Sequence, residues 1–148
     1  MRNISPSIIA ADFTKLEKEI MIVEDLGMNR LHLDIMDGNF VPNITFGPFV
    51  VEAIRKMTNL HLECHLMINK AGHYIDEFIS AGADTVIVHF ENNTDVENNL
   101  IEIRKRNAKS GLAFNPDSSV ENIVELLPLI DYVLIMSVFP GFCGQSFI

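Results

Sequence analysis

The strongest constraint on the fold is an alternation of short apolar runs with longer segments of helical period, repeated about every 25 residues. This alternation is typical of βα units on a parallel sheet. The expected strands are Ile4–Ile9, Leu31–Met36, His61–Met67, Thr85–His89, Gly111–Phe114 and Tyr132–Val138. The expected helices are Phe13–Leu26, Phe49–Met57, Tyr74–Ser80, Val96–Arg106 and Val120–Leu127. The sequence therefore predicts an α/β fold with six βα units.

Three glycines, Gly27, Gly82 and Gly111, follow expected helices, where a left-handed residue favours helix termination. No Pro- or Ser-rich linker divides the chain. Residues 1–148 are therefore expected to belong to a single domain.

The charge balance restricts the partners. The 148 residues contain 11 Lys and Arg against 20 Asp and Glu, a formal net charge of −9. Such a chain is not expected to bind nucleic acid or an anionic membrane surface as its main partner. A phosphorylated substrate stays open, because backbone N–H groups can bind phosphate without net positive charge.

The cysteines and the apolar runs bear on location. The two cysteines, Cys64 and Cys143, have no CxxC spacing, and the first residues show no cationic segment followed by a long apolar one. No apolar run approaches the roughly 20 residues of a spanning helix. We therefore expect a cytoplasmic protein with no membrane role.

Polar side chains recur at every second position of two expected strands. Residues two apart on a strand share a face, and the carboxyl ends of parallel strands meet at one edge. The two sets are His32, Asp34 and Met36, and Glu63, His65 and Met67. Two imidazoles and a carboxylate can converge there on a divalent metal. Mixed nitrogen and oxygen ligands suit Zn²⁺, Fe²⁺, Co²⁺ or Mn²⁺ better than Ca²⁺.

Each of these residues also has a plain structural interpretation. A single strand histidine, His89 above all, is more often a hydrogen-bonded core residue than a ligand. Methionines commonly fill cores, and Asp37-Gly38 alone indicates a turn. The cluster is informative as a whole, because several buried polar groups on adjacent strands all need partners.

Several segments resemble the ribulose-phosphate 3-epimerase family. These are "ISPSIIAADF", "LHLDIMDGNFVPNITFGP", "ECHLMI", "AGAD", "VHFE", "GLAFNPDS" and "VLIMSVFPGFCGQSF", in that family's order and approximate spacing. The resemblance covers this whole chain, but only about the first two-thirds of a complete member. It implies a (β/α)8 TIM barrel, with six of the eight βα units present here and the barrel incomplete at the C-terminus.

The resemblance also implies an activity and a set of site residues. The activity is metal-dependent interconversion of D-ribulose 5-phosphate and D-xylulose 5-phosphate, with one divalent cation and two acid/base carboxylates. His32, Asp34 and His65 would bind the metal, and Asp34 would be one of the two carboxylates. The substrate would contact Ser7, His65, Met36, Met67, Met136 and the loop Gly141, Phe142, Cys143 and Gly144. Members of this family commonly form homo-oligomers.

The chain departs from the family pattern at three places. The second carboxylate, also a metal ligand, belongs to a seventh strand, and a phosphate site belongs to an eighth; neither lies within residues 1–148. Were these residues the whole molecule, weak metal binding and little activity would be expected. Cys143 stands where Gly or Ala is usual, which strains the loop only if that position needs φ > 0. Phe139 replaces a commonly polar residue.

The sequence is also compatible with other functions. An allulose-6-phosphate 3-epimerase would use the same catalytic residues. A truncated, non-catalytic remnant could bind a partner through its unclosed strands, although it would have had no need to keep His32, Asp34 and His65. A nucleotide-binding sheet is the least favoured, since neither GxGxxG after the first strand nor GxxxxGK[ST] occurs. Glu63 could support His65 or simply lie in a polar interior.

Overall fold

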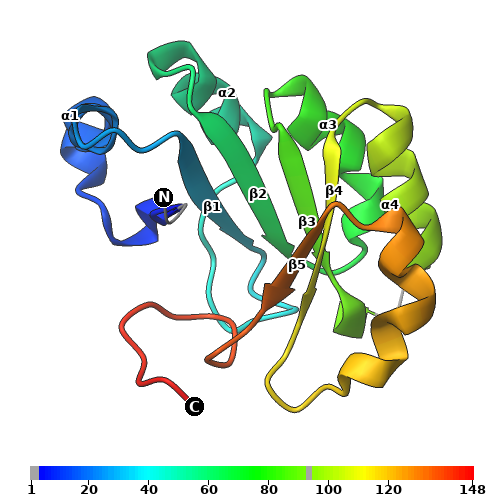
Figure 1. The fold of residues 1–148 in the computed structure, drawn as a ribbon. Helices are drawn as coiled ribbons and strands as arrows, with labels where there is room; N and C mark the ends of the chain where they lie inside the picture. Colours follow the sequence, from blue (N-terminus) through cyan, green and yellow to red (C-terminus); the bar gives the residue numbers. More distant parts are fainter. Residues whose placement is uncertain (1–3, 93–94) are drawn as a thin grey trace.

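A computed structural model describes residues 4–92 and 95–148, and their strands form one parallel sheet of five strands in the order β1-β2-β3-β4-β5 (Figure 1). The strands are β1 (Arg30–Met36), β2 (His61–Met67), β3 (Thr85–His89), β4 (Lys109–Phe114) and β5 (Tyr132–Ile135). All neighbouring pairs are parallel, and helical segments connect them. The predicted α/β class is confirmed, as part of a (β/α)8 barrel.

The helices lie mainly on one face of the sheet, and the carboxyl ends of the strands point to the edge where the C-terminal loop lies (Figure 1). The α-helices are α1 (Leu16–Asp25), α2 (Pro48–Met57), α3 (Ile75–Ser80) and α4 (Val96–Lys105). Short 3-10 helices are η1 (Ile8–Ala10), η2 (Phe13–Lys15), η3 (Ala71–His73) and η4 (Phe90–Asn92). Within the described ranges, none of the helices has the length and apolar character needed to cross a membrane.

The prediction of a first strand over Ile4–Ile9 is wrong. The structure has a single parallel bridge, between Ser7 and His32, and the chain then turns into η1. Pro6 has no N–H to donate to a ladder, and the Ser7 hydroxyl accepts the N–H of Ile9 at 3.2 Å, which starts the turn. The described residues therefore form five strands, not six.

The fifth predicted helix, Val120–Leu127, is also different. The structure has a 3-10 helix, η5 (Val120–Leu129), and Pro128 lies inside it. Proline lacks the N–H that a regular α-helical turn would use. The next strand, β5, ends at Ile135, three residues before the predicted end.

The two faces of the sheet differ in character. Side chains of Leu31, Leu33 and Ile35 on β1 are 0–2% exposed and belong to the large core cluster beneath the helices. The alternate positions of the same strand place His32 and Asp34 on the opposite, inner face. Sheet alternation therefore brings the polar residues of β1 and β2 together, away from the helices.

The prediction that Gly111 ends a helix is wrong. Gly27 and Gly82 do have φ of 72° and 109° after helices, but Gly111 lies within β4. A Cβ added there would meet the Ile87 Cγ1 atom at 2.6 Å. The missing side chain therefore permits close packing of β3 and β4 on the inner face.

Candidate metal centre and substrate pocket

Strand register arranges the inner-face residues of β1 and β2 in three layers. His32 lies opposite Glu63, Asp34 opposite His65, and Met36 opposite Met67. The apolar layer is nearest the carboxyl ends of the strands, where Met36 and Met67 form a small cluster with Val41.

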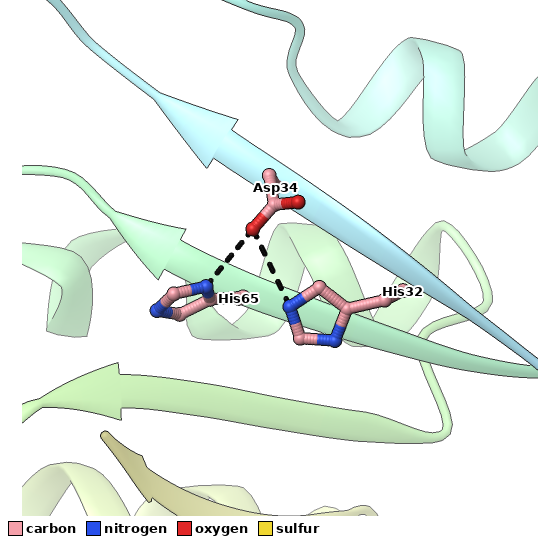
Figure 2. Close-up of side chains that lie close together, drawn as sticks. All are labelled: His32, Asp34 and His65. Atoms are coloured by element: carbon pink, nitrogen blue, oxygen red, sulfur yellow. Dashed lines mark hydrogen bonds and ion pairs between the residues drawn. The ribbon is translucent and has the colours of Figure 1, made fainter. Parts of the chain in front are cut away.

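His32, Asp34 and His65 converge as predicted (Figure 2). The Asp34 Oδ1 atom lies 3.0 Å from His65 Nδ1 and 3.3 Å from His32 Nε2. One ligand atom from each residue lies within 4.8 Å of the others. Atoms that each bind a cation at about 2.1 Å are separated by about 3.0–3.4 Å, so the two distances from Asp34 Oδ1 fit a shared divalent metal.

The electrostatics of the three residues differ. Burial disfavours ionisation of Asp34, yet hydrogen bonds and charges from the two histidines hold its pKa well below its usual range. Burial also opposes the charged form of His32, but Asp34 and Glu63 outweigh it and raise the pKa of His32 to about 9. Burial lowers the pKa of His65 to about 4. A neutral His65 imidazole thus faces an ionised carboxylate that also contacts a protonated His32.

Ser7 contacts the same carboxylate from the other side. Its hydroxyl donates to Asp34 Oδ2 at 2.5 Å. The main chain holds Ser7 in place, because its bridge to His32 is completed by a 2.9 Å hydrogen bond from the His32 N–H to the Pro6 carbonyl. Both oxygens of Asp34 are therefore oriented by neighbouring side chains.

A cavity of about 220 Å³ opens beside Asp34. Its lining includes most of the residues expected to contact substrate: Ser7, Met36, Met67, Met136, Gly141, Phe142 and Cys143. His65 lies behind Asp34 and does not line the cavity, and neither does Gly144, which turns the loop with φ of 73°. Phe139 is part of the lining. The wall is therefore mostly apolar, with a carboxylate and a hydroxyl at one side.

Two amides that sequence reasoning missed hold the loop over this cavity. The Gln145 side chain donates to the carbonyls of Phe139 and Phe142 at 2.8 and 2.9 Å. The Asn43 side chain donates to the Gly141 carbonyl at 2.9 Å. Both amides lie within the quoted motifs "VPN" and "PGFCGQ", which is the one signal that could have identified them.

Cys143 does not strain the loop. The non-glycine residues with positive φ in the described part of the chain are Lys70, Asp95 and Asn107. The Cys143 side chain is exposed, and its position does not need glycine. The substitution is therefore compatible with the loop.

Glu63 contacts His32 and not His65. The interpretation that Glu63 supports His65 is therefore wrong. Glu63 Oε2 lies 3.5 Å from His32 Nδ1, and Glu63 Oε1 accepts from the Arg30 guanidinium at 2.6 Å. Arg30 also donates to the Tyr132 hydroxyl at 2.5 Å. No motif connects Arg30 and Tyr132 with the site, so sequence reasoning missed both residues.

His89 extends the cluster onto β3. Its Nε2 atom lies 2.8 Å from His65 Nε2, and its Nδ1 atom lies 3.0 Å from Glu91 Oε2. The sequence favoured a core histidine at this position. His89 is indeed fully buried, but it contacts a candidate ligand.

Comparison with known proteins identifies the family of the chain. The model of the ribulose-phosphate 3 epimerase family matches residues 3–148. Ribulose-phosphate 3-epimerase of Chlamydia pneumoniae is 48% identical over 98% of this chain and 63% of the relative. The enzymes of Synechocystis sp. and Bacillus subtilis are 46% and 45% identical, and the matches cover 64% and 68% of those proteins. The chain thus spans a little under two-thirds of the length of several relatives. It belongs to the ribulose-phosphate 3-epimerase family.

Proposed function

We propose that this protein catalyses metal-dependent epimerisation at C3 of a ketose phosphate, interconverting D-ribulose 5-phosphate and D-xylulose 5-phosphate. The observation that carries the proposal is the position of Asp34. Its carboxylate belongs to the His32–Asp34–His65 cluster and also borders the cavity. Family membership supports the same reaction.

Asp34 can move a proton at one face of the substrate. The C3 proton is weakly acidic because it is adjacent to the C2 carbonyl, so its removal needs a positioned base. Ser7 donates to one carboxylate oxygen and fixes the orientation of the group. Asp34 would therefore accept the C3 proton on one face, or return it in the reverse reaction.

The residues of the cluster would hold the cofactor. Zn²⁺, Fe²⁺, Co²⁺ or Mn²⁺, when bound, would supply positive charge that stabilises the enediolate oxygens. Neutral His65 and ionised Asp34 are in the protonation states that such a ligand requires. His32 would have to lose its proton on binding.

Inversion at C3 needs a second acid on the opposite face of the planar intermediate. Among the described residues that line the cavity, Asp34 is the one carboxylic acid. The family resemblance implies that the second carboxylate belongs to a seventh strand, outside residues 1–148. The proposal for the whole protein therefore includes that group.

The methionines would shield the reacting carbons from water. Met36 and Met67 are 5% and 1% exposed, and both line the cavity together with Met136. Thioethers offer weak hydrogen bonding, so they leave few competing partners for the charged intermediate. The loop that contains Gly141, Phe142 and Cys143 would cover the sugar phosphate.

The test is a coupled assay of D-xylulose 5-phosphate formation with the protein purified at its natural length and supplied with metal. Asp34→Asn is expected to lower kcat by at least about 100-fold, because the amide cannot accept the proton. Glu52→Gln, at an exposed pair with Lys56, is the matched control. Asp34→Asn with kcat within about threefold of wild type would contradict the assignment of this general base.

The same assay with allulose 6-phosphate identifies the sugar. A higher kcat/KM for the six-carbon substrate would reassign the reaction to a hexulose-phosphate epimerase. Absence of turnover on both sugars, together with absence of metal binding, would favour a non-catalytic protein.

A further inference from the structure

The loop after β5 covers the cavity beside Asp34 but has few contacts that hold it there. Residues 137–145, here called the covering loop, contain no charged side chain, and residues 138–143 line the cavity. Within the described ranges, one hydrogen bond joins the covering loop to the elements before β5, from the Asn43 side chain to the Gly141 carbonyl at 2.9 Å. The position of the loop therefore depends on this contact and on the packing around it.

Gly141 is the point at which the covering loop packs on the rest of the protein. Gly141 is buried, whereas the nearby Phe139 and Phe142 are 49% and 57% exposed. Its φ of 130° lies in the region that favours glycine. A Cβ added at Gly141 would lie 3.5 Å from Val41 Cβ and 3.6 Å from Pro42 Cδ. The loop therefore rests directly on the residues that precede Asn43.

Internal hydrogen bonds make the covering loop a unit. The Gln145 side chain donates to the carbonyls of Phe139 and Phe142 at 2.8 and 2.9 Å. One amide thus connects three positions of the loop. Because these positions are joined to one another, a contact at Gly141 can set the position of the whole loop over the cavity.

The turn that contains Asn43, residues 37–45, is in turn fixed to β1. The Asn43 Oδ1 atom accepts the N–H of Ile44 at 2.9 Å, which orients the amide. The Thr45 hydroxyl donates to the Asp34 carbonyl at 2.7 Å. Asn43 therefore extends from a segment that is bonded to the strand of the proposed general base.

Resting on the proposed function, we propose that Asn43 is a positioning residue whose amide holds the covering loop over the bound sugar phosphate. Asn43 does not line the cavity, so it acts on the substrate through the loop. Because its turn is bonded to β1, the loop and Asp34 are held in a fixed relation to each other.

The test uses Asn43→Asp in the protein purified at its natural length. A carboxylate cannot donate to the Gly141 carbonyl, but it can still accept the N–H of Ile44, so the turn keeps its local hydrogen bond. Asn39→Asp is the matched control. It makes the same change of amide to carboxylate on the same turn, where the Asn39 amide donates to the Asp37 carbonyl at 3.1 Å and not to the loop.

The first readout is the rate of chymotrypsin cleavage after Phe142, measured by mass spectrometry without substrate or metal. Cleavage within a folded protein requires local opening, and its rate follows the population of the opened state. We expect cleavage about 5- to 10-fold faster in Asn43→Asp, as for the loss of one hydrogen bond, and within about twofold of wild type in Asn39→Asp.

The second readout is the separation of KM from kcat in the coupled assay. A loop that holds the substrate and the transition state equally well contributes to KM alone. Asn43→Asp should therefore raise KM about 5- to 10-fold and leave kcat within about threefold of wild type. A role limited to stability would reduce the amount of folded enzyme, which lowers the apparent kcat and leaves KM unchanged.

Three results would overturn the inference: cleavage of Asn43→Asp at the wild-type rate, equally accelerated cleavage of Asn39→Asp, or a lowered kcat with unchanged KM in Asn43→Asp. Accelerated cleavage in Asn43→Asp alone, together with no epimerase turnover by the wild-type protein, would support the positioning of the loop by Asn43 and contradict the proposed function. The two failures are therefore distinguishable.

Discussion

At the residue scale, the site depends on hydrogen bonds that orient a single carboxylate. The period-two pattern of β1 and β2 predicted the convergence of His32, Asp34 and His65, because sheet alternation is a property of the backbone. Ser7 was identified through family resemblance alone. The contact of His89 with His65 could not be predicted, since it depends on which rotamers meet between two neighbouring strands.

Removal of the Ser7 hydroxyl tests this orientation. Ser7→Ala deprives Asp34 Oδ2 of its 2.5 Å donor, and we expect kcat to fall about 10-fold, the equivalent of about 1.4 kcal/mol. The measurement is kcat and KM in the coupled assay, with Ser146→Ala at an exposed position as the control. Equal reductions in both variants, or none in Ser7→Ala, would disprove an orienting role.

The lowered pKa of Glu91 predicts that this residue makes a pH-dependent contribution to the free energy of unfolding. Its pKa falls from 4.5 to about 2 on folding, so its contribution is fully present above pH 4.5 and is lost as the pH falls through about 2. Glu91→Gln should lower the free energy of unfolding by roughly 3 kcal/mol or less near neutral pH. Urea unfolding at a series of pH values measures the difference from wild type. A difference that grows toward acid pH would have the wrong sign.

At the element scale, the accuracy of the prediction followed the depth of burial. β2 and β3 have the predicted bounds, and both strands are buried over almost their whole length. The Ile4–Ile9 segment failed because Pro6 and Ser7 favour a turn, and η5 differs from an α-helix at Pro128. Local chemistry thus overrode the apolar pattern at the less protected elements.

Gly111 offers a test of packing between β3 and β4. Gly111→Ala would place a Cβ 2.6 Å from Ile87 Cγ1, and we expect about 1–3 kcal/mol of destabilisation from overpacking. Gly47→Ala is the matched control, because no atom lies within 4 Å of the added Cβ. Chemical denaturation of both variants gives the comparison. A Gly111→Ala protein as stable as Gly47→Ala would show that β3 and β4 have room to adjust.

At the scale of the whole molecule, the parallel arrangement brings the site together from distant segments. β1 to β4 present their inner-face residues to one another, and the loop after β5 returns to cover the cavity beside β1 (Figure 1). The βα repeat predicted this class of architecture. The number of strands could not be derived from periodicity alone. The Ile4–Ile9 segment has the sequence pattern of a strand, although it forms only one bridge, between Ser7 and His32.

The most direct test of the central claim is a Co²⁺ titration of the metal-free protein, followed by its visible absorption. The account predicts a saturable spectrum with one Co²⁺ per chain in wild type, because His32, Asp34 and His65 supply one set of ligands. Binding should weaken by more than about 10-fold in His65→Ala and stay unchanged in His61→Ala. No saturable spectrum in wild type, or the same affinity in His65→Ala, would contradict the assignment of these residues as a metal centre.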